Sequence, residues 1–212
     1  MEKRGILIVV SGFSGAGKGT LMKKLLSVHG ETYALSVSAT TRKPREGEVH
    51  GREYFFSSTE EFEKMIAQDE LIEYAKYVEH YYGTPKAYVV EQLEAGRDVI
   101  LEIEIQGALK VKEKYPDTLL LFVTPPSAEE LKKRLVGRGT ETMEVINARM
   151  ARAVEESVFM DRYDYLIVND DLDACAEEMH QIIRAEHMAS GRNVPFMECI
   201  KKELKELQQK AV

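Results

Sequence analysis

The sequence predicts an α/β protein with a parallel sheet at its core and helices on both faces of that sheet. Apolar runs alternate with helical patterns along the chain, and such runs are typical of strands buried on both faces. The first run leads directly into a glycine-rich segment that opens a helical pattern. A length of 212 residues, with 44% hydrophobic and 31% charged content, suits one such domain with insertions.

The first element is a strand at Ile6–Val10, and a helix is predicted from Leu21 onward. Between them stands the segment Gly12-Phe13-Ser14-Gly15-Ala16-Gly17-Lys18-Gly19-Thr20. Glycines let backbone N–H groups approach phosphate oxygens, the helix dipole favours negative charge, and the lysine reaches the terminal phosphates. This order of elements therefore predicts a phosphate-binding loop. Its usual pattern has Ser or Thr directly after the lysine as a Mg²⁺ ligand, whereas this chain has Gly19 there and Thr20 next.

An insertion of about 60 residues, 35–94, separates the first strand-helix unit from the second core strand. It contains short β-prone pieces at Tyr54–Phe56, Leu71–Tyr74 and Tyr81–Pro85, with a helix predicted at Thr59–Ala67. We expect a small mixed α/β subdomain here.

The remaining core elements follow in order. Strands are predicted at Val99–Leu101, Leu119–Val123 and Tyr165–Val168, all buried on both faces. Ser127 and Glu130 form a capping-box pattern that opens a helix through Leu135. Two later helices are predicted, at Leu172–His187 and Glu198–Lys210, and the last carries charge pairs at helical spacing.

The segment from Arg134 to about Glu156 is rich in arginine, with Arg138 in a Gly-Arg-Gly turn. Gly137 and Gly139 offer hinge positions. A mobile arginine-bearing lid suits phosphoryl transfer, in which water is excluded and charge is stabilised. The alternative is an ordinary charged helix surface.

Bulk composition excludes several protein classes. The net charge of −7 argues against binding to a nucleic acid polymer, which requires a basic surface. Cys175 and Cys199 are too few for a disulfide framework, so we expect reduced thiols and a cytoplasmic protein. No apolar run has the length of a transmembrane helix or a signal segment, so no membrane association is expected.

The ordered set of motifs resembles the guanylate kinase family, the nucleoside monophosphate (NMP) kinases that pass a phosphoryl group from ATP to GMP. The resemblance covers nearly the whole chain. The matching segments are Gly12–Thr20, Ser36–Arg45, Gly47–Gly51 with Tyr54, Tyr81–Thr84, Ile103–Gly107, Gly137–Thr142 and Ile167–Asp171.

The resemblance implies a P-loop three-layer core with a parallel sheet, a mixed α/β NMP-binding insertion and a helical lid. The core would comprise residues 1–34, 95–133 and 157–190, with the GMP-binding subdomain at 35–94. The lid would comprise residues 134–156, and residues 191–212 would form a C-terminal helical extension.

The resemblance also implies roles on the acceptor side. Arg42, Arg45, Tyr54 and Tyr82 would hold the GMP phosphate, and two arginines three residues apart suit a dianion. Glu73 would accept the two adjacent N–H donors of guanine, and such pairing discriminates by roughly 10⁴-fold or more. The alternative for Glu73 is a charge at a strand edge. Hydroxyls of Ser38 and Thr84 would contact the base.

Glu102 and Glu104 follow the strand at 99–101, where alternation places both on one face near its carboxyl end. The family usually has aspartates there. We expect Glu104 to touch the guanine or its sugar side. Glu102, which the resemblance also places among the GMP-binding residues, would lie near Mg²⁺ waters. Thr20 would be a second contact through water, with no certain protein ligand for the metal.

The remaining roles concern catalysis and ATP. The expected catalytic residues are Lys18, Arg134, Arg138 and Arg149, and Asn169 would lie near the adenine. The residues expected to bind ATP are Gly12, Ser14, Gly15, Ala16, Gly17, Lys18, Gly19, Thr20 and Asn169. The partners are ATP with Mg²⁺ and GMP or dGMP, and we expect a monomer or weak homo-oligomer.

Two other readings stay open from the sequence. One is a non-catalytic guanylate-kinase-like module that binds a phosphopeptide, although such modules usually lose the phosphate loop. The other is a related kinase with a different phosphorylated acceptor, such as a ribose bisphosphate.

Overall fold

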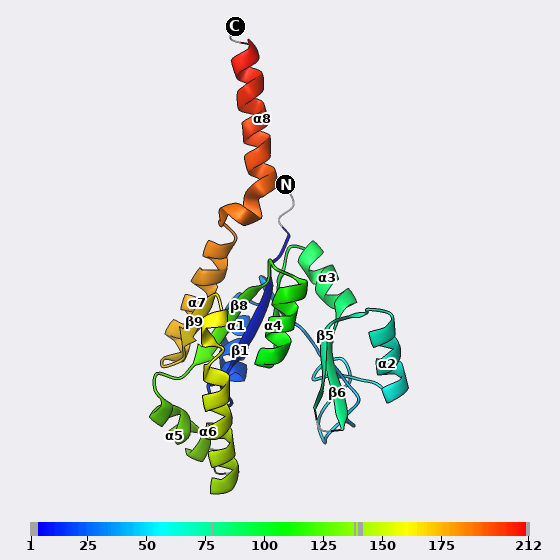
Figure 1. The fold of residues 1–212 in the computed structure, drawn as a ribbon, viewed down its shortest axis with the longest axis vertical. Coiled ribbons are helices and arrows are strands. Elements are labelled where there is room, and N and C mark those ends of the chain that lie inside the picture. Colours follow the sequence, from blue (N-terminus) through cyan, green and yellow to red (C-terminus); the bar gives the residue numbers. More distant parts are fainter. Residues whose placement is uncertain (1–3, 78, 138, 140–141, 211–212) are drawn as a thin grey trace. The chain divides into compact units, whose positions relative to one another are not determined.

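The computed structural model describes residues 4–77, 79–137, 139 and 142–210. The chain forms two compact units, of which the first ends at Ala176 and the second begins at Glu177. Figure 1 colours the chain from blue at the N-terminus to red at the C-terminus and labels many of its helices and strands.

The core of the first unit is a five-stranded sheet in the order β2-β7-β1-β8-β9, with every neighbouring pair parallel. Its strands are β1 (Leu7–Gly12), β2 (Tyr33–Leu35), β7 (Asp98–Glu102), β8 (Leu119–Thr124) and β9 (Tyr165–Val168). This arrangement confirms the predicted α/β class and the four predicted core strands. Strand β2, only three residues long, extends the sheet beyond them.

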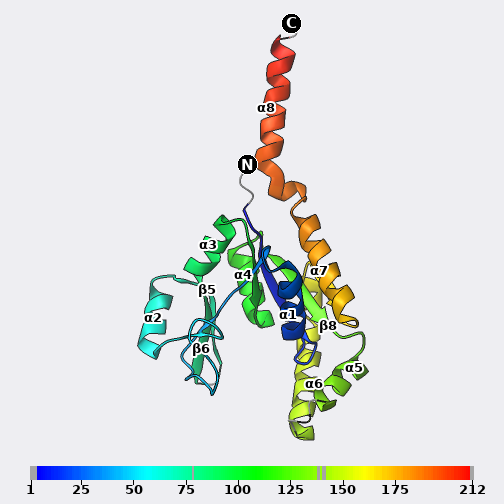
Figure 2. The same ribbon diagram turned by 180° about the vertical axis from the view of Figure 1, so that it is seen from behind.

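Helices cover both faces of this sheet. Helix α4 (Ile105–Lys114) lies beside β1 on the near side in Figure 1, where helix α1 (Lys18–His29) is fainter, and α1 is on the near side in the reverse view of Figure 2. The central strands are therefore fully buried: Ile8, Val9 and Leu121 have no exposed surface. Burial on both sides explains why these strands read as continuous apolar runs.

The prediction that β9 is buried on both faces is wrong. Its burial is confined to Ile167, whereas Tyr165, Leu166 and Val168 are each at least 40% exposed. Among the described residues the strand pairs with β8 alone and forms an edge of the sheet. Leu166 and Val168, which alternate along β9 and so share one face, are both exposed, so that face is not covered.

The insertion forms a second sheet of four strands in the order β4-β3-β6-β5, with β3 and β4 parallel and the other pairs antiparallel. Its strands are β3 (Ala39–Thr40), β4 (Phe55–Phe56), β5 (Leu71–Tyr77) and β6 (His80–Pro85). The predicted helix is present as α2 (Thr59–Ala67), opened by a full capping box between Ser58 and Glu61. Phe62 from α2 is fully buried and stacks on Tyr81.

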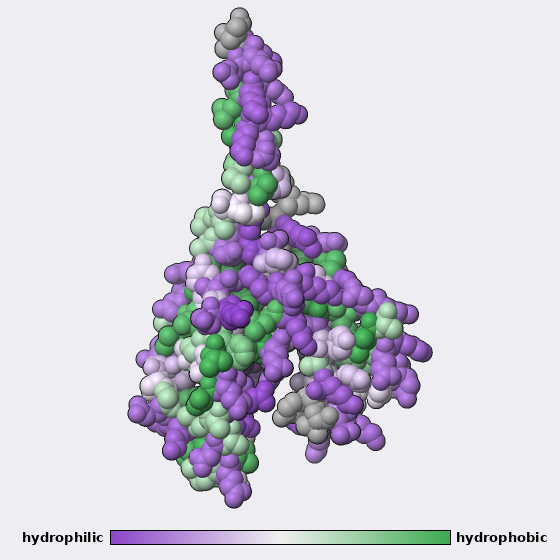
Figure 3. Space-filling model, in the orientation of Figure 1, coloured by the Kyte–Doolittle hydropathy of each residue, from purple (hydrophilic) through white to green (hydrophobic). Residues whose placement is uncertain are grey.

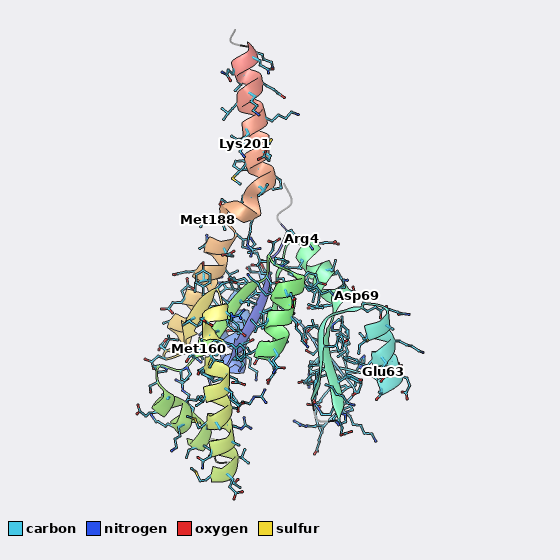
Figure 4. The ribbon with its side chains drawn as sticks, in the orientation of Figure 1. Arg4, Glu63, Asp69, Met160, Met188 and Lys201 are labelled. Carbon is cyan, nitrogen blue, oxygen red and sulfur yellow. The ribbon has the colours of Figure 1, made fainter. Side chains whose placement is uncertain are left out.

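Asp69, labelled in Figure 4, connects the turn after α2 to two other elements. Its carboxylate lies 2.8 Å from Lys86 at the start of α3 (Lys86–Glu94) and 2.6 Å from Lys114 at the end of α4. Hydrogen bonds from Lys114 and Lys86 lower the pKa of Asp69 to about 2. The second sheet is thus tied to a helix of the core.

Two helices occupy the arginine-rich segment and its approach. Helix α5 (Ala128–Gly137) begins as predicted, with the Ser127 hydroxyl accepting a hydrogen bond from the Glu130 backbone N–H. Helix α6 (Met143–Ser157) is capped by Thr142, and a short 3₁₀ turn (Met160–Arg162) leads to β9.

Helix α7 (Leu172–Glu186) begins in the first unit and ends in the second. The second unit continues through a 3₁₀ turn (Ser190–Asn193) to α8 (Val194–Lys210), which starts four residues earlier than predicted. Figure 3 shows α8 as largely hydrophilic with an apolar edge, to which Ile200, Leu204 and Leu207 contribute exposed side chains. Among the described residues, no helix combines the length and the apolarity needed to cross a membrane.

Candidate active site

The phosphate loop joins β1 to α1. Lys18 is the first residue of α1, and its ammonium group folds back to donate to the carbonyls of Gly12, at 2.7 Å, and Phe13, at 3.2 Å. Phe13 itself is buried and packs edge-on against Phe122 of β8. The lysine therefore curls over a loop that is anchored in the core.

Two glycines of this loop have neighbours so close that a side chain would not fit. A Cβ at Gly12 would lie 2.0 Å from the Val123 carbonyl oxygen, so β1 and β8 could not approach as they do. Gly17, at the helix N-terminus, has a φ of 92°, and its Cβ would lie 2.4 Å from the side-chain amide of Asn169. A substitution at either position would have to displace backbone or a buried amide.

Asn169 is buried directly after β9, and its amide donates to the carbonyl of Ala16 at 2.8 Å. The sequence predicts this residue near the adenine. In the structure it braces the phosphate loop from the end of β9, which is separated from β1 by β8 in the sheet.

Two of the expected catalytic arginines approach the same loop. Arg134 on α5 donates to Glu130 at 2.9 Å and lies 3.5 Å from the Ala16 carbonyl, while Arg149 on α6 donates to the Ser14 hydroxyl. Leu135 of α5 packs against Gly15, where a Cβ would meet it at 2.8 Å. Arg138 lies outside the described residues.

The side-chain oxygens of Thr20 and Glu102 are the ones expected to contact Mg²⁺ through water. Thr20 is exposed in the first turn of α1, and Glu102 ends β7 beside Val10 of β1. The Glu102 side chain keeps exposed surface, but partial desolvation of its carboxyl group raises its pKa, and the charge of Lys18 opposes this shift. Within the described residues no cluster of three acidic, histidine or cysteine side chains forms a metal cage. Hard oxygen donors of this kind fit Mg²⁺ held mainly by phosphates and water.

The second sheet gathers the predicted phosphate-binding residues. The Arg42 guanidinium lies 5.3 Å from the centre of the Tyr54 ring, and the Tyr54 and Tyr82 rings are 6.0 Å apart, edge to face. Burial raises the pKa of Tyr54, and its protonated hydroxyl can donate a hydrogen bond at neutral pH. The structure thus brings three of the four residues together.

Arg45 is exposed, and its backbone N–H donates to Glu48 at 2.8 Å. Glu48 also receives two hydrogen bonds from Arg42, each at 2.9 Å. These hydrogen bonds, with Arg42 contributing most, hold the pKa of Glu48 below its usual range.

Glu73 lies on β5 next to Thr84 of β6, whose hydroxyl donates to one carboxylate oxygen at 2.9 Å. Thr84 is fully buried and Glu73 largely so. Burial raises the pKa of Glu73, while the Thr84 hydrogen bond and the charge of Lys110 act in the opposite direction. Ser38, the other expected base contact, precedes β3 and is half-buried, and its carbonyl accepts from Phe55.

Glu102 and Glu104 are not two alternating residues of one strand. Strand β7 ends at Glu102, and Glu104 is the N-cap residue of α4. The Glu104 carboxylate forms an ion pair with Arg152 of α6. Beside this pair lies a cavity of about 550 Å³, between the first turn of α4 and one side of α6.

Comparisons with known proteins agree with this geometry. The family model for guanylate kinase matches residues 4–186. The chain belongs to the guanylate kinase family. It is 52% identical to the guanylate kinase of Caldanaerobacter subterraneus subsp. tengcongensis over 193 residues, covering 91% of this chain and 93% of that one.

Other relatives extend the comparison. The guanylate kinase of Streptococcus thermophilus is 54% identical over 192 residues, which cover 91% of this chain and 92% of that one. The crystal structure of guanylate kinase from Anaplasma phagocytophilum matches with a TM-score of 0.71 and 33% identity, covering 90% of each chain. The fold class and the kinase family predicted from the sequence are thereby confirmed.

Two residues beside the expected site were not assigned a role from the sequence. Glu48 lies in the segment Gly47–Gly51, which carries part of the family resemblance. Its place between these two glycines was the only sequence feature that could have indicated a role. Gly107 is a glycine inside a helical pattern, which often indicates a packing constraint. In the structure Gly107 is buried in α4 and faces Glu73.

Proposed function

We propose that this protein transfers the γ-phosphoryl group of ATP reversibly to GMP or dGMP and so produces ADP and GDP or dGDP. The observation that carries the proposal is one unit that combines a phosphate loop with a buried carboxylate, Glu73, beside an arginine and two tyrosines. The first group of residues suits a nucleoside triphosphate, and the second suits a guanine nucleotide.

On the donor side, the backbone of residues 12–20 would cradle the ATP phosphates at the N-terminus of α1. Lys18 would leave the carbonyls of Gly12 and Phe13 and bind the terminal phosphates. Arg134 and Arg149 already contact the loop through Ala16 and Ser14, so short movements would bring them to the transferring group. We assign Arg138 the same role from the family resemblance.

On the acceptor side, Arg42, Arg45, Tyr54 and Tyr82 would bind the GMP phosphate. Glu73 would accept the ring N–H and the exocyclic amine of guanine, while Ser38 and Thr84 would contact the base. Adenine presents an acceptor beside a single donor and would repel the carboxylate. Glu104 is proposed to reach the guanine or sugar side after its ion pair with Arg152 opens.

Mg²⁺ is proposed to accompany ATP, with Thr20 and Glu102 contacting it through water. When bound, the ion neutralises charge on the ATP phosphates. The side chains then orient the two substrates and exclude water. A phosphate oxygen of GMP forms the new bond to the γ-phosphorus as the bond to the bridging oxygen of ADP breaks. No protein nucleophile is required.

We propose the cytoplasm as the location, because neither cysteine forms a disulfide and the proposed substrates are cytoplasmic nucleotides. A monomeric or weakly oligomeric state and the division into core, acceptor region and lid stay predictions.

A coupled assay of ADP release tests this function. GMP and dGMP should support rapid ADP release, whereas AMP, UMP and ribose phosphates should not. If a ribose phosphate is the better acceptor, the protein is a kinase of another class. If GMP binds without ADP release, the protein is a binding module.

A further inference from the structure

The carboxylate of Glu73 has two oxygens in different surroundings. One oxygen accepts the hydrogen bond from Thr84 at 2.9 Å. The other, Oε2, faces Gly107 in the first half of α4, and a Cβ built at position 107 would lie 3.3 Å from it. A glycine of the core helix therefore borders the one carboxylate oxygen that Thr84 does not occupy.

Glycine is an unfavourable choice at this helical position. Residue 107 is buried within α4, and its backbone φ is not in the left-handed region that favours glycine. Alanine would suit the helix better, because glycine loses more conformational freedom on folding. The helix itself therefore supplies no reason for a glycine, and the reason lies with its neighbours.

Those neighbours leave little room for a methyl group. The same Cβ would lie 3.4 Å from Cδ1 of Ile103, so it would be held between Ile103 and the Glu73 carboxylate. Glu73 cannot withdraw freely, because Thr84 holds its other oxygen and the next residue, Tyr74, is paired with Gly83 of β6. A methyl group would shift the carboxylate by a few tenths of an ångström and would shield Oε2 from solvent.

We infer that Gly107 is a positioning residue for the acceptor base: it keeps space beside Oε2 of Glu73, so that this oxygen points toward the exocyclic amine of guanine. The inference rests on the proposed role of Glu73. Glycine at this position makes α4 less stable than alanine would, but it preserves recognition of the acceptor base. Position 107 thereby contributes to base selection without contacting the base.

The variant Gly107→Ala tests this inference. Its melting temperature should change little, because the higher helix propensity of alanine opposes the crowding against Ile103 and Glu73. The KM for GMP should rise roughly tenfold, as expected when a charge-assisted hydrogen bond is weakened, with the KM for ATP unchanged. The KM for IMP, which lacks the exocyclic amine, should rise much less. The ratio by which the protein prefers GMP over IMP should therefore become smaller. The rise in the KM for GMP at acid pH should also begin at a higher pH, because the methyl group desolvates the Glu73 carboxyl group further and so raises its pKa.

Gly191→Ala is the matched control, since a Cβ there meets nothing within 4 Å. It should leave both KM values and the preference for GMP unchanged. The double variant Glu73→Gln/Gly107→Ala should show little added effect over Glu73→Gln alone, because the glycine acts through that carboxylate.

Two results would overturn the inference: an unchanged KM for GMP, or an equal rise in KM for GMP, IMP and ATP in Gly107→Ala. Failure of the proposed function is separately visible. In that case Glu73→Gln itself would leave the KM for GMP unchanged, or the parent protein would not phosphorylate GMP.

Discussion

Arg42 and Glu48 form a two-pronged ion pair in which each terminal guanidinium nitrogen donates to a different carboxylate oxygen, both at 2.9 Å. Both side chains are largely shielded, at 14% and 18% exposure. The backbone N–H of Arg45 joins the same carboxylate at 2.8 Å. Glu48 thus fixes the orientation of the guanidinium that is proposed to bind the GMP phosphate.

Glu48→Gln should therefore weaken acceptor binding. An amide keeps the size of the side chain but presents an N–H group to the guanidinium and breaks the fork. We expect a roughly fivefold higher KM for GMP, with kcat and the KM for ATP nearly unchanged. Glu53→Gln is the control, because Glu53 pairs with Arg52 in the same loop. A lower KM for GMP would mean that Glu48 competes with the phosphate instead of positioning Arg42.

Lys18→Ala should remove the positive charge that acts on the transferring group. Steady-state kinetics should show a kcat lower by roughly 10²–10³-fold, the usual cost of one such donor. The melting temperature should change little, since the ammonium group donates to carbonyls of the loop itself, those of Gly12 and Phe13. Lys24→Ala, on the same helix and paired with Asp173, should keep normal turnover. Near-normal turnover in Lys18→Ala would refute the assignment of the phosphate loop.

Gly17→Ala should damage the ATP side alone. The alanine Cβ would collide with the Asn169 amide, and its backbone would be held at a φ of 92°. We expect a higher KM for ATP, an unchanged KM for GMP and a loss of roughly 1–3 kcal/mol in the free energy of unfolding. Gly47→Ala is the control, because Gly47 has a similar φ of 84° but a Cβ there would meet nothing within 4 Å. Its loss of stability therefore measures the backbone strain without a collision. Equal losses in both variants would show that Asn169 is not a brace.

Acceptor binding should depend on pH through Glu73. Burial raises the pKa of this carboxyl group above its ordinary value of 4.5, and the ionised form is the one that accepts guanine's donors. The KM for GMP should therefore rise as the pH falls through the raised pKa. The folded state also binds this proton more tightly than the unfolded chain, so this group increases the free energy of unfolding as the pH falls through the same window.

The pH profile of Glu73→Gln separates this effect from titration of the GMP phosphate. In Glu73→Gln, the KM for GMP should still change with pH where the GMP phosphate titrates. The change caused by titration of the Glu73 carboxyl group should be absent. Identical profiles in the two proteins would exclude Glu73 as the titrating group.

The core of the fold was predictable because its strands are buried on both faces and read as apolar runs. Leu119–Val123, for example, could be identified as a strand without any structure. The phosphate loop was equally visible, because its function requires glycines and a lysine at fixed spacing. Tyr33–Leu35 was not identified, since three residues are too few to show a period. The exposure of β9 could not be predicted, because an apolar run does not reveal whether other elements cover both faces of the strand.

Side-chain partners were less predictable than the residues themselves. Arg42, Tyr54 and Tyr82 were expected together and lie together, because strand pairing brings distant segments into register. The partners Glu48 for Arg42 and Arg152 for Glu104 depend on loop and helix geometry, which leaves no periodic trace in a sequence. Gly107 acts through the space that it leaves, and this becomes visible only when Glu73 has been placed opposite it.

Recognition of guanine by Glu73 is the central claim, and steady-state kinetics of Glu73→Gln test it most directly. The amide replaces one acceptor oxygen with a donor that faces guanine's own donors. The KM for GMP should rise roughly 100-fold or more, in line with the cost of unpaired groups in a base-reading site, while the KM for ATP stays the same. A KM for GMP equal to that of the parent protein would contradict the account and leave Glu73 a structural residue.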